Sequence, residues 1–311
     1  FNPSIVNHPD QSGLNPGERR FILSLRATGE GHISSIEFAS GLISAQGELS
    51  LDPRSKQLVS AAISDHNGLD SDYSIAFGKE TMLENRVIFP HTPDESNGME
   101  DVRFVEFFNQ DQSTYIGTYT AYDGRQIRSK LIETKDFVSF RIRALAGKAI
   151  VGKGMALFPE KIGSQYAMTG RQDGENISIM YSKDLYSWDH YTPIQFPVRE
   201  WELMQLGNCG SPVKTDAGWL LLTHAVGPMR KYVISASLLD LHHPEVVLGT
   251  LDIPLLEADA SEREGYVPNV VYTCGVLKYL KHLIIPYAMS DSTVGFARVG
   301  VQEIIDVMLK R

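Results

Sequence analysis

The chain has 311 residues, of which 42% are hydrophobic and 22% charged, and its formal net charge at pH 7 is −9. This composition is typical of a globular protein with a full core and excludes a disordered chain. Because no run of Lys or Arg is present, the sequence carries no electrostatic footprint for nucleic acid or an anionic membrane surface.

The two cysteines, Cys209 and Cys274, are too few for a disulfide framework and form no CxxC metal pair. We therefore expect reduced thiols and a cytoplasmic location. No window approaches eighteen apolar residues, and the first residues show no basic region followed by an apolar core, so neither a membrane span nor a secretion signal is expected. The chain opens at Phe1 rather than Met, which leaves an upstream region open.

Short apolar runs rich in Val, Ile, Tyr and Phe, separated by Gly, Asp, Asn and Pro, indicate many short strands. A weak internal repeat predicts five hairpins, at residues 19–38, 115–134, 166–185, 218–241 and 282–301. In four of them a preceding strand ends in a turn, as in a propeller blade. We predict an all-β fold, a five-bladed β-propeller with about sixty residues per blade, as a single domain over residues 1–311. A two-sheet sandwich or a β-helix is the alternative.

Two segments stand outside the repeat. Residues 40–98 run longer between hairpins and include the polar stretch HTPDESNG, so we expect them to join two blades and to cover the site. At the other end of the chain, Val301, Ile304, Ile305 and Met308 recur at helical spacing. This spacing predicts a short amphipathic C-terminal helix packed on the propeller rim.

Polar residues at equivalent hairpin positions should converge at one mouth of a propeller channel. These residues are Arg26, Glu30, His32, Asp123, Arg171, Asp173, Glu175, His224, Arg230 and Asp291. For Asp123 and Asp291 a turn that bonds its own backbone is the favoured interpretation. Flanking glycines around Glu30 suggest a close approach to a ligand. The segment 171–176, which ends in Asn176, carries more polar groups than a solvated turn requires, and such groups bind sugar hydroxyls.

Glycosyl transfer to water or phosphate needs a proton donor and, where water attacks, a base. Asp101 lies beside Glu100 and Arg103 directly before a strand, so one of the two acids could face the channel while the arginine steers the other. If phosphate is the nucleophile, cations must gather around it. The candidates from separate hairpins are Lys153, Arg171, His224 and Arg230.

The sequence lacks the motifs of several other enzyme classes. The sequence contains no GxSxG, HExxH or P-loop, and no GxGxxG between a strand and a helix. The neighbouring His242 and His243 precede Pro244, where a surface turn is a simpler interpretation than a metal site. We therefore expect no metal.

At these residues the sequence resembles glycoside hydrolase family 130. The ordered series that carries the resemblance covers nearly the whole chain and comprises FNPSIV, GMEDVRFV, TYTAYDG, GMALFPEKI, RQDGEN, GSPVKTDAGWLLLTHAVGP, LLDL, EREGYVPNVVYTCG and IPYAMSD. The resemblance implies a five-bladed propeller, an inverting mechanism and β-mannosides as substrates.

The resemblance also implies residue roles. Asp101, within GMEDVR, matches the family's proton donor, whose proton passes through a hydroxyl of the bound mannosyl unit in the phosphorylases. Lys153, Arg171 and His224 match its phosphate-binding positions. Two places depart from the family pattern: Gly154 and Met155 stand where many phosphorylases have Asp-Ala, and THAV replaces YHGV.

We thus predict an inverting phosphorylase that converts a β-mannoside oligosaccharide and inorganic phosphate to α-mannose 1-phosphate, with no cofactor. The predicted substrate-binding residues are Arg26, Glu30, His32, Arg103, Asp173, Glu175, Asn176, Arg230 and Asp291. One alternative is a β-mannosidase of the same family, in which water is activated by a glutamate, with Glu30, Glu175, Glu202 and Glu264 as candidates. Another is a non-catalytic propeller that binds glycan or protein. A homo-oligomer is left open.

Overall fold

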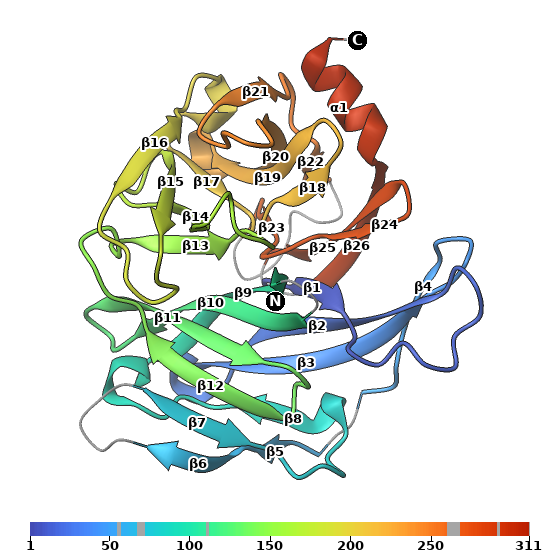
Figure 1. The fold of residues 1–311 in the computed structure, drawn as a ribbon, viewed down its shortest axis with the longest axis vertical. Helices are drawn as coiled ribbons and strands as arrows, with labels where there is room; N and C mark the ends of the chain where they lie inside the picture. The colour runs from blue at the N-terminus through green and yellow to red at the C-terminus, as the bar shows by residue number, and fades with distance from the viewer. Residues whose placement is uncertain (55–56, 67–71, 110–111, 260–267, 291–292, 311) are drawn as a thin grey trace.

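The computed structural model describes residues 1–54, 57–66, 72–109, 112–259, 268–290 and 293–310. This part of the chain consists mainly of antiparallel β-strands and ends in an α-helix (Figure 1). The predicted all-β class is therefore confirmed. No helix among the described residues is long and apolar enough to cross a membrane.

The N-terminal half of the chain forms two antiparallel meanders. The first contains β1 (Ser4–Asn7), β2 (Arg19–Thr28), β3 (Ser34–Ile43) and β4 (Leu49–Leu51). The second contains β9 (Gly98–Asn109), β10 (Gln112–Tyr122), β11 (Ile127–Thr134) and β12 (Ser139–Ala144). One parallel bridge, Ser34 to Gly98, joins β3 to β9. Gly98 has φ = +134°, and a Cβ there would lie 2.7 Å from the Ser34 nitrogen, so this close approach requires glycine.

Three further sheets follow in chain order. One contains β13 (Lys153–Leu157), β14 (Tyr166–Arg171), β15 (Ile177–Ser182) and β16 (Tyr191–Gln195). The next contains β17 (Gln205–Asn208), β18 (Val213–Thr215), β19 (Gly218–Val226), β20 (Tyr232–Leu239), β21 (Val247–Thr250) and β22 (Leu256–Glu257). The last contains β23 (Val271–Tyr272), β24 (Leu277–Tyr279), β25 (His282–Met289) and β26 (Thr293–Gly300).

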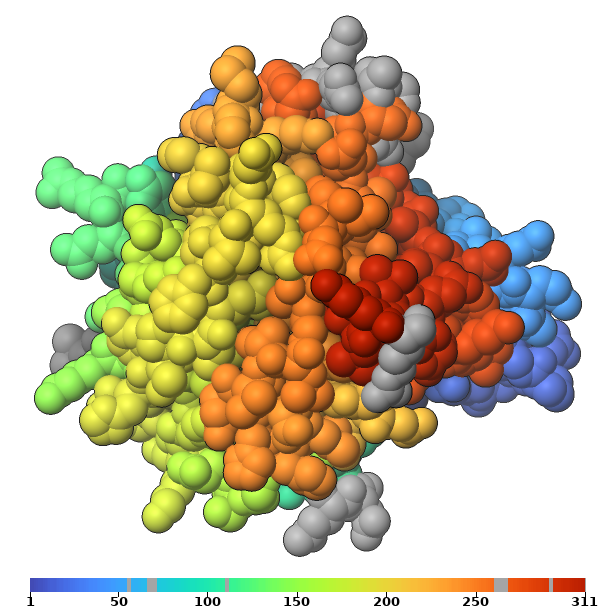
Figure 2. All heavy atoms as spheres, turned by 90° about the horizontal axis from the view of Figure 1, so that it is seen from above, coloured from blue at the N-terminus to red at the C-terminus, as the bar shows by residue number. Residues whose placement is uncertain are grey.

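The five predicted hairpins are all present, as β2–β3, β10–β11, β14–β15, β19–β20 and β25–β26. The predicted C-terminal helix is also confirmed. It is α1 (Val301–Leu309), and it buries the four apolar residues at helical spacing, Val301, Ile304, Ile305 and Met308. Figure 2 shows this helix, in dark red, resting on the orange segment that contains β21, where Gly249 lies close to the Met308 backbone.

Five hydrophobic clusters fill the spaces between consecutive strand groups of the described chain. In chain order, the clusters contain Phe38 with Phe104, Leu131 with Met168, Phe158 with Trp219, Leu222 with Leu283, and Phe21 with Ile284. The first four each join one strand group to the next. The fifth joins the last group to the first, so the groups pack in a closed circle.

Each strand group contributes one strand to the centre of this circle, namely β1, β9, β13, β17 and β23 (Figure 1). The segments that carry these strands line a large cavity with Asn2, Asp101, Lys153, Gln205 and Tyr272. Further along each of the same segments, Asn7, Glu106, Pro159, Ser211 and Gly275 line a second cavity of about 270 Å³. The five strands therefore run in the same direction along a common axis.

Residues 40–98 differ from the expectation. Their further strands are β5 (Val59–Ser60), β6 (Ala62–His66), β7 (Tyr73–Ala76) and β8 (Arg86–Ile88), with short 3-10 turns at Leu83–Asn85 (η2) and Pro93–Glu95 (η3). Strand β7 pairs with β12, and β6 extends that edge outward. None of the described residues in this segment lines the large cavity, so the prediction that it covers the site is wrong for them.

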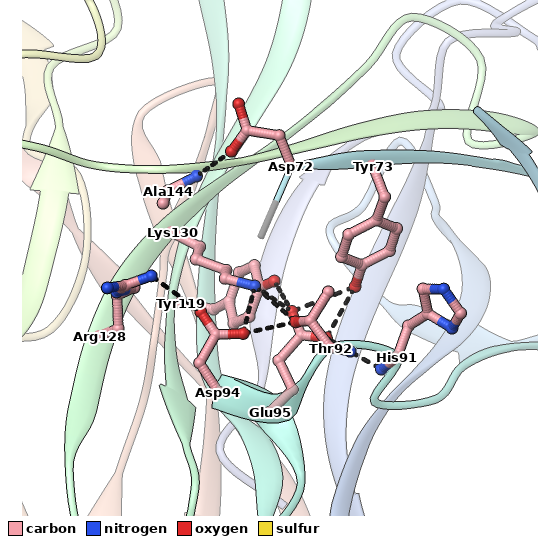
Figure 3. A network of polar contacts seen from close by, with 10 residues as sticks. All are labelled: Asp72, Tyr73, His91, Thr92, Asp94, Glu95, Tyr119, Arg128, Lys130 and Ala144. Carbon is pink, nitrogen blue, oxygen red and sulfur yellow. Dashed lines mark hydrogen bonds and ion pairs between the residues drawn. The ribbon is translucent and has the colours of Figure 1, made fainter. Parts of the chain in front are cut away.

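A buried ion cluster holds the turn that leads into β9 (Figure 3). Lys130 on β11 has a fully buried side chain, and its ammonium lies 3.0 Å from the carboxylates of both Asp94 and Glu95 in η3. The hydroxyls of Tyr73 and Tyr119 also donate to Glu95. Burial raises the pKa of Glu95, but Lys130 and the hydrogen bonds outweigh it and lower the pKa below its usual value. The segment entering β9 is therefore fixed by a buried, charged cluster of ion pairs and hydrogen bonds.

Candidate active site

The large cavity has a volume of about 430 Å³ and collects side chains from all five strand groups. Its lining residues are Asn2, Asp101, Arg103, Thr120, Lys153, Gly154, Arg171, Gln205, Gly207, Asn208, His224, Arg230, Tyr232, Val270 and Tyr272. Four of these are Arg or Lys, and Asp101 is the one carboxylate among the described lining residues. An acidic protein thus contains a cavity that is locally basic.

Asp101 lies on a β-bulge. Between the pairs Glu100–Thr120 and Arg103–Thr118, two residues of β9 face a single residue of β10. The backbone of Asp101 is left-handed, with φ = +54°, which is uncommon for a residue other than glycine. Bulges re-aim side chains beside active sites, and strained backbone persists where the surroundings fix it. Local strain therefore turns this carboxylate toward the cavity.

Three neighbours hold the Asp101 carboxylate and set its charge. The side-chain amide of Asn2 donates to Oδ1 at 2.7 Å, and the Arg26 guanidinium lies 3.4 Å from the same oxygen. Burial raises the pKa of Asp101, but Arg26, Arg103 and the Asn2 hydrogen bond outweigh it, so the pKa lies below its ordinary value. Without substrate, Asp101 is ionised at neutral pH.

Glu100, the residue before Asp101, joins two cations. Its carboxylate oxygens accept one hydrogen bond from Arg26 Nη2 and one from Lys153 Nζ, each at 2.8 Å. The side chain of Glu100 is largely buried, whereas Lys153 is partly exposed and lines the cavity. Glu100 thus faces away from the reaction space and holds Lys153 at its wall.

Arg171, the cross-strand partner of Lys153, lies beside His224, with Arg171 Nη1 3.2 Å from His224 Nε2. Burial lowers the pKa of His224 well below its usual value, and the guanidiniums of Arg171 and Arg103 lower it further. The imidazole is therefore neutral and offers a hydrogen bond rather than a charge. Gly207 makes room for it, because a Cβ at this position would lie 2.5 Å from the His224 ring.

Several buried polar atoms around the cavity have no hydrogen-bond partner among the residues that the structure describes. They are Nε of Arg103, Nε of Arg171, and both amide atoms of Asn208. Buried polar groups in native proteins are nearly always bonded, so a cluster of exceptions in one cavity indicates a polar ligand.

The structure brings six of the predicted site residues to the cavity wall: Asp101, Arg103, Lys153, Arg171, His224 and Arg230. Arg26 stands behind Asp101 as its ion-pair partner. Asp291 and Glu264 lie outside the described residues.

The remaining predicted residues lie at hairpin tips. Glu30 and His32 belong to the exposed turn η1 (Glu30–His32). Asp173 accepts hydrogen bonds from the backbone N–H groups of Glu175 and Asn176, which is the bonding of a turn residue. None of these five lines the cavity. Asp123 bonds Arg125 and Gln126 in the same way, which confirms its predicted turn role.

Sequence reasoning missed six polar residues that line the cavity: Asn2, Thr120, Gln205, Asn208, Tyr232 and Tyr272. Asn2, Thr120 and Tyr272 lie in segments quoted for the family resemblance, which could have pointed to them. Tyr232 begins a predicted strand, and its position relative to His224 follows from the hairpin register. Among the described residues, no group of His, Cys, Asp or Glu is arranged to hold a metal ion.

Comparison with known proteins identifies related sequences. The family model of glycoside hydrolase family 130, described as beta-1,4-mannooligosaccharide phosphorylase, matches residues 34–310. A 1,2-beta-oligomannan phosphorylase from Thermoanaerobacter sp. (strain X514) is 32% identical over 227 residues, which are 71% of this chain and 75% of that protein. A beta-1,2-mannobiose phosphorylase from Listeria innocua serovar 6a is 29% identical over 232 residues, which are 72% of this chain and 64% of that protein.

Solved structures share the fold. The beta-1,2-mannobiose phosphorylase from Listeria innocua, in complex with beta-1,2-mannobiose, has a TM-score of 0.65 at 22% identity, covering 100% of this chain and 94% of that one. A glycosyl hydrolase from Bacteroides ovatus has a TM-score of 0.69 at 17% identity, covering 97% and 84%. At these identities the likeness concerns the arrangement of the chain and not its chemistry.

Proposed function

Because the chain belongs to glycoside hydrolase family 130, we propose that it is an inverting phosphorylase that cleaves β-mannosides with inorganic phosphate and releases α-mannose 1-phosphate. The linkage we propose is β-1,2, since two related proteins are named for action on β-1,2-linked mannosides. Phosphate is then a co-substrate, and the reaction needs no metal or cofactor.

The charge of the cavity is the observation that best supports phosphorolysis. An inverting hydrolase uses two carboxylates, one as acid and one as the base that activates water. Among the described lining residues, Asp101 is alone as a carboxylate, whereas Arg103, Lys153, Arg171 and Arg230 are cations. A phosphate dianion matches such a set and needs no base, because it is already a nucleophile.

Of the four glutamates considered for hydrolysis, Glu264 lies outside the described residues and the other three lie away from the cavity wall. Glu202 is buried in the turn η4 (Glu200–Glu202), where it accepts from the backbone N–H groups of Val198 and Arg199 and pairs with the Arg199 side chain. Glu30 and Glu175 are exposed at hairpin tips. A β-mannosidase therefore finds less support than a phosphorylase.

The proposed reaction conserves atoms and charge. A phosphate oxygen attacks the anomeric carbon from the face opposite the leaving group, the bond from that carbon to the glycosidic oxygen breaks, and the configuration inverts. Asp101 supplies the proton to the leaving oxygen, directly or through a sugar hydroxyl. Hydrogenphosphate returns a proton to Asp101, so the products are mannose 1-phosphate and the shortened mannoside.

A bound dianion also accounts for the protonation of Asp101. In the substrate-free structure, nearby cations keep this carboxyl ionised. Phosphate beside Lys153 and Arg103 would offset part of that positive potential and raise the pKa of Asp101, as a nearby anion does. The acid would then form only when the nucleophile is in place.

We also infer that the described strand groups are the five blades of one propeller over residues 1–311. Five antiparallel groups, five clusters between them and five central strands running in one direction support this count. A cytoplasmic location and any homo-oligomer stay predictions.

The test is to incubate the protein with β-1,2- and β-1,4-linked mannobiose, with and without phosphate, and to quantify mannose 1-phosphate and free mannose separately. Phosphate-dependent mannose 1-phosphate from the β-1,2 substrate is expected. Equal release of free mannose in both conditions would make the protein a hydrolase. Binding of mannosides without either product would favour the non-catalytic alternative.

A further inference from the structure

The side-chain amide of Asn208, the last residue of β17, is buried in the cavity wall. The exposure of Asn208 is 1%, and neither its amide oxygen nor its amide nitrogen has a hydrogen-bond partner among the described residues. A buried amide left unbonded costs free energy, so a residue chosen for stability alone would be apolar here. The side chain therefore indicates a ligand that supplies both a donor and an acceptor.

The space in front of Asn208 is open because of Gly154. This glycine has a left-handed backbone, with φ = +83°. A Cβ on it would meet no atom closer than Arg103 Nη2 at 3.8 Å and Asn208 Oδ1 at 4.0 Å. A guanidinium nitrogen and an amide oxygen thus face the same niche, and Nε of Arg103 is also without a partner.

The niche lies within the proposed phosphate site. Lys153 precedes Gly154 directly. Asn208 follows Gly207, which pairs in register with His224 and whose Cβ position lies 3.2 Å from Arg171 Nη1. Asn208 is therefore surrounded by the cationic and donor groups that would hold the phosphate oxygens.

These neighbours differ from Asn208 in one chemical respect. Arginine and lysine side chains only donate hydrogen bonds, whereas an amide always offers one acceptor oxygen and one N–H₂ donor, whichever way it is turned. At neutral pH, hydrogenphosphate has three acceptor oxygens and one O–H group. Sulfate has the same shape and charge but no O–H group. The amide oxygen of Asn208 can therefore distinguish hydrogenphosphate, which donates a hydrogen bond to it, from sulfate, which cannot.

Building on the proposed phosphorolysis, we infer that Asn208 accepts a hydrogen bond from the protonated oxygen of hydrogenphosphate in the niche at Gly154. Asn208 is then the residue that selects phosphate over fully deprotonated tetrahedral anions. Hydrogenarsenate, which carries an O–H group, would be accepted like phosphate.

The experiment compares the wild-type protein with Asn208→Ala. We expect KM for phosphate to rise about tenfold or more, as the loss of a hydrogen bond to a charged ligand predicts. The inhibition constant of sulfate, measured in the same assay, should rise by a clearly smaller factor, because sulfate can accept from the Asn208 N–H₂ group but donates nothing to the Asn208 oxygen. The KM for arsenate should rise by a factor similar to that for phosphate. The thermal stability of the variant should equal or exceed that of the wild type.

A matched control separates selectivity from affinity. Lys153→Met removes a positive charge that attracts both anions, so it should weaken the binding of phosphate and the binding of sulfate by similar factors. If Asn208→Ala behaves like this control, the inference is wrong and Asn208 only shapes the site. If KM rises for the mannoside instead of phosphate, Asn208 binds a sugar hydroxyl, and the inference is equally overturned.

Failure of the proposed function is distinguishable from failure of this inference. Titration calorimetry with inorganic phosphate and with sulfate needs no turnover. If the protein hydrolyses mannosides but binds phosphate more tightly than sulfate through Asn208, the phosphorylase assignment is wrong and the inference about Asn208 stands. If the protein is a phosphorylase but its Asn208→Ala variant keeps the full preference for phosphate, the assignment stands and the inference is wrong.

Discussion

The left-handed backbone at Asp101 decides which substitutions can test its role. Asparagine tolerates this conformation, and its side-chain oxygen can still accept the hydrogen bond from Asn2. Asp101→Asn should therefore fold normally and lose about 10²- to 10⁴-fold in kcat, the usual contribution of a general acid. The measurement is phosphate-dependent release of mannose 1-phosphate, with circular dichroism to verify the fold.

Asp101→Leu is the contrasting variant. Leucine at a positive φ costs about 1–2 kcal/mol, and this variant leaves Arg26 and Arg103 without their shared carboxylate. It should lose stability as well as activity. Should the Asn variant retain more than a tenth of wild-type kcat, Asp101 is not the proton donor.

The titration of His224 should make the protein less stable as the pH falls. Burial and two guanidiniums lower its pKa well below the usual value, so the folded protein keeps it neutral. In the unfolded chain it binds a proton below about pH 6.5. The unfolded state thus gains protons on acidification, and this residue reduces the free energy of unfolding by up to about 1.4 kcal/mol for each pH unit below 6.5.

The variant His224→Gln removes this titration while keeping a polar side chain of similar reach. We expect the wild type to lose more unfolding free energy than the variant between pH 7.5 and pH 5.5, measured by urea denaturation. Equal losses in the two proteins would mean that His224 binds a proton as readily in the folded state as in the unfolded chain, which would contradict the lowered pKa.

Single residues were predictable where a charged side chain sits near the start of a central strand. Lys153 and Asp101 meet this condition, because strand and charge are both visible in sequence. Glu30 and Asp173 are equally polar, but they occupy the outer tips of hairpins, and the distance of a tip from the axis is not encoded locally. Asn208 was missed because a lone amide at the end of a short strand, between Gly207 and Gly210, carries no local signal.

At the scale of secondary-structure elements, hairpins were predicted and remote pairings were not. The β14–β15 hairpin is closed by a turn whose residues are contiguous, so sequence alone places it. Strand β7, by contrast, pairs with β12, which lies more than sixty residues further along the chain. Nothing within residues 40–98 specifies that partner, which is why this segment was expected to cover the cavity instead.

The buried cluster around Lys130 ties this segment to the site, and its energetics can be tested. Lys130→Met leaves Glu95 buried without its cation, which should reduce the free energy of unfolding by about 3–5 kcal/mol. Adding Glu95→Leu to this variant removes the unpaired charge. The double variant should recover part of the loss in urea denaturation. If it is no more stable than the single variant, the cluster stabilises through the Tyr73 and Tyr119 hydrogen bonds rather than through charge pairing.

For the whole molecule, the contact between the first and last strand groups closes the circle. The backbone oxygen of Pro3 accepts from the Cys274 N–H at 2.8 Å, and Ile5 packs in the same cluster as Ile284. A ligand in the large cavity touches several groups at once, because every group lines it. Binding there should therefore stabilise the molecule as a unit.

We expect the protein to unfold in one cooperative transition that inorganic phosphate shifts upward. At a concentration of 100 times Kd, phosphate adds about 2.7 kcal/mol to the free energy of unfolding, which corresponds to a rise of roughly 3–5 °C in Tm for a chain of this size. Arg171→Met, which removes a cation from the wall, should reduce the shift without changing the number of transitions. Differential scanning calorimetry measures both quantities. Two transitions, of which phosphate moves only one, would show that the strand groups unfold separately and that the closed circle is not a single cooperative unit.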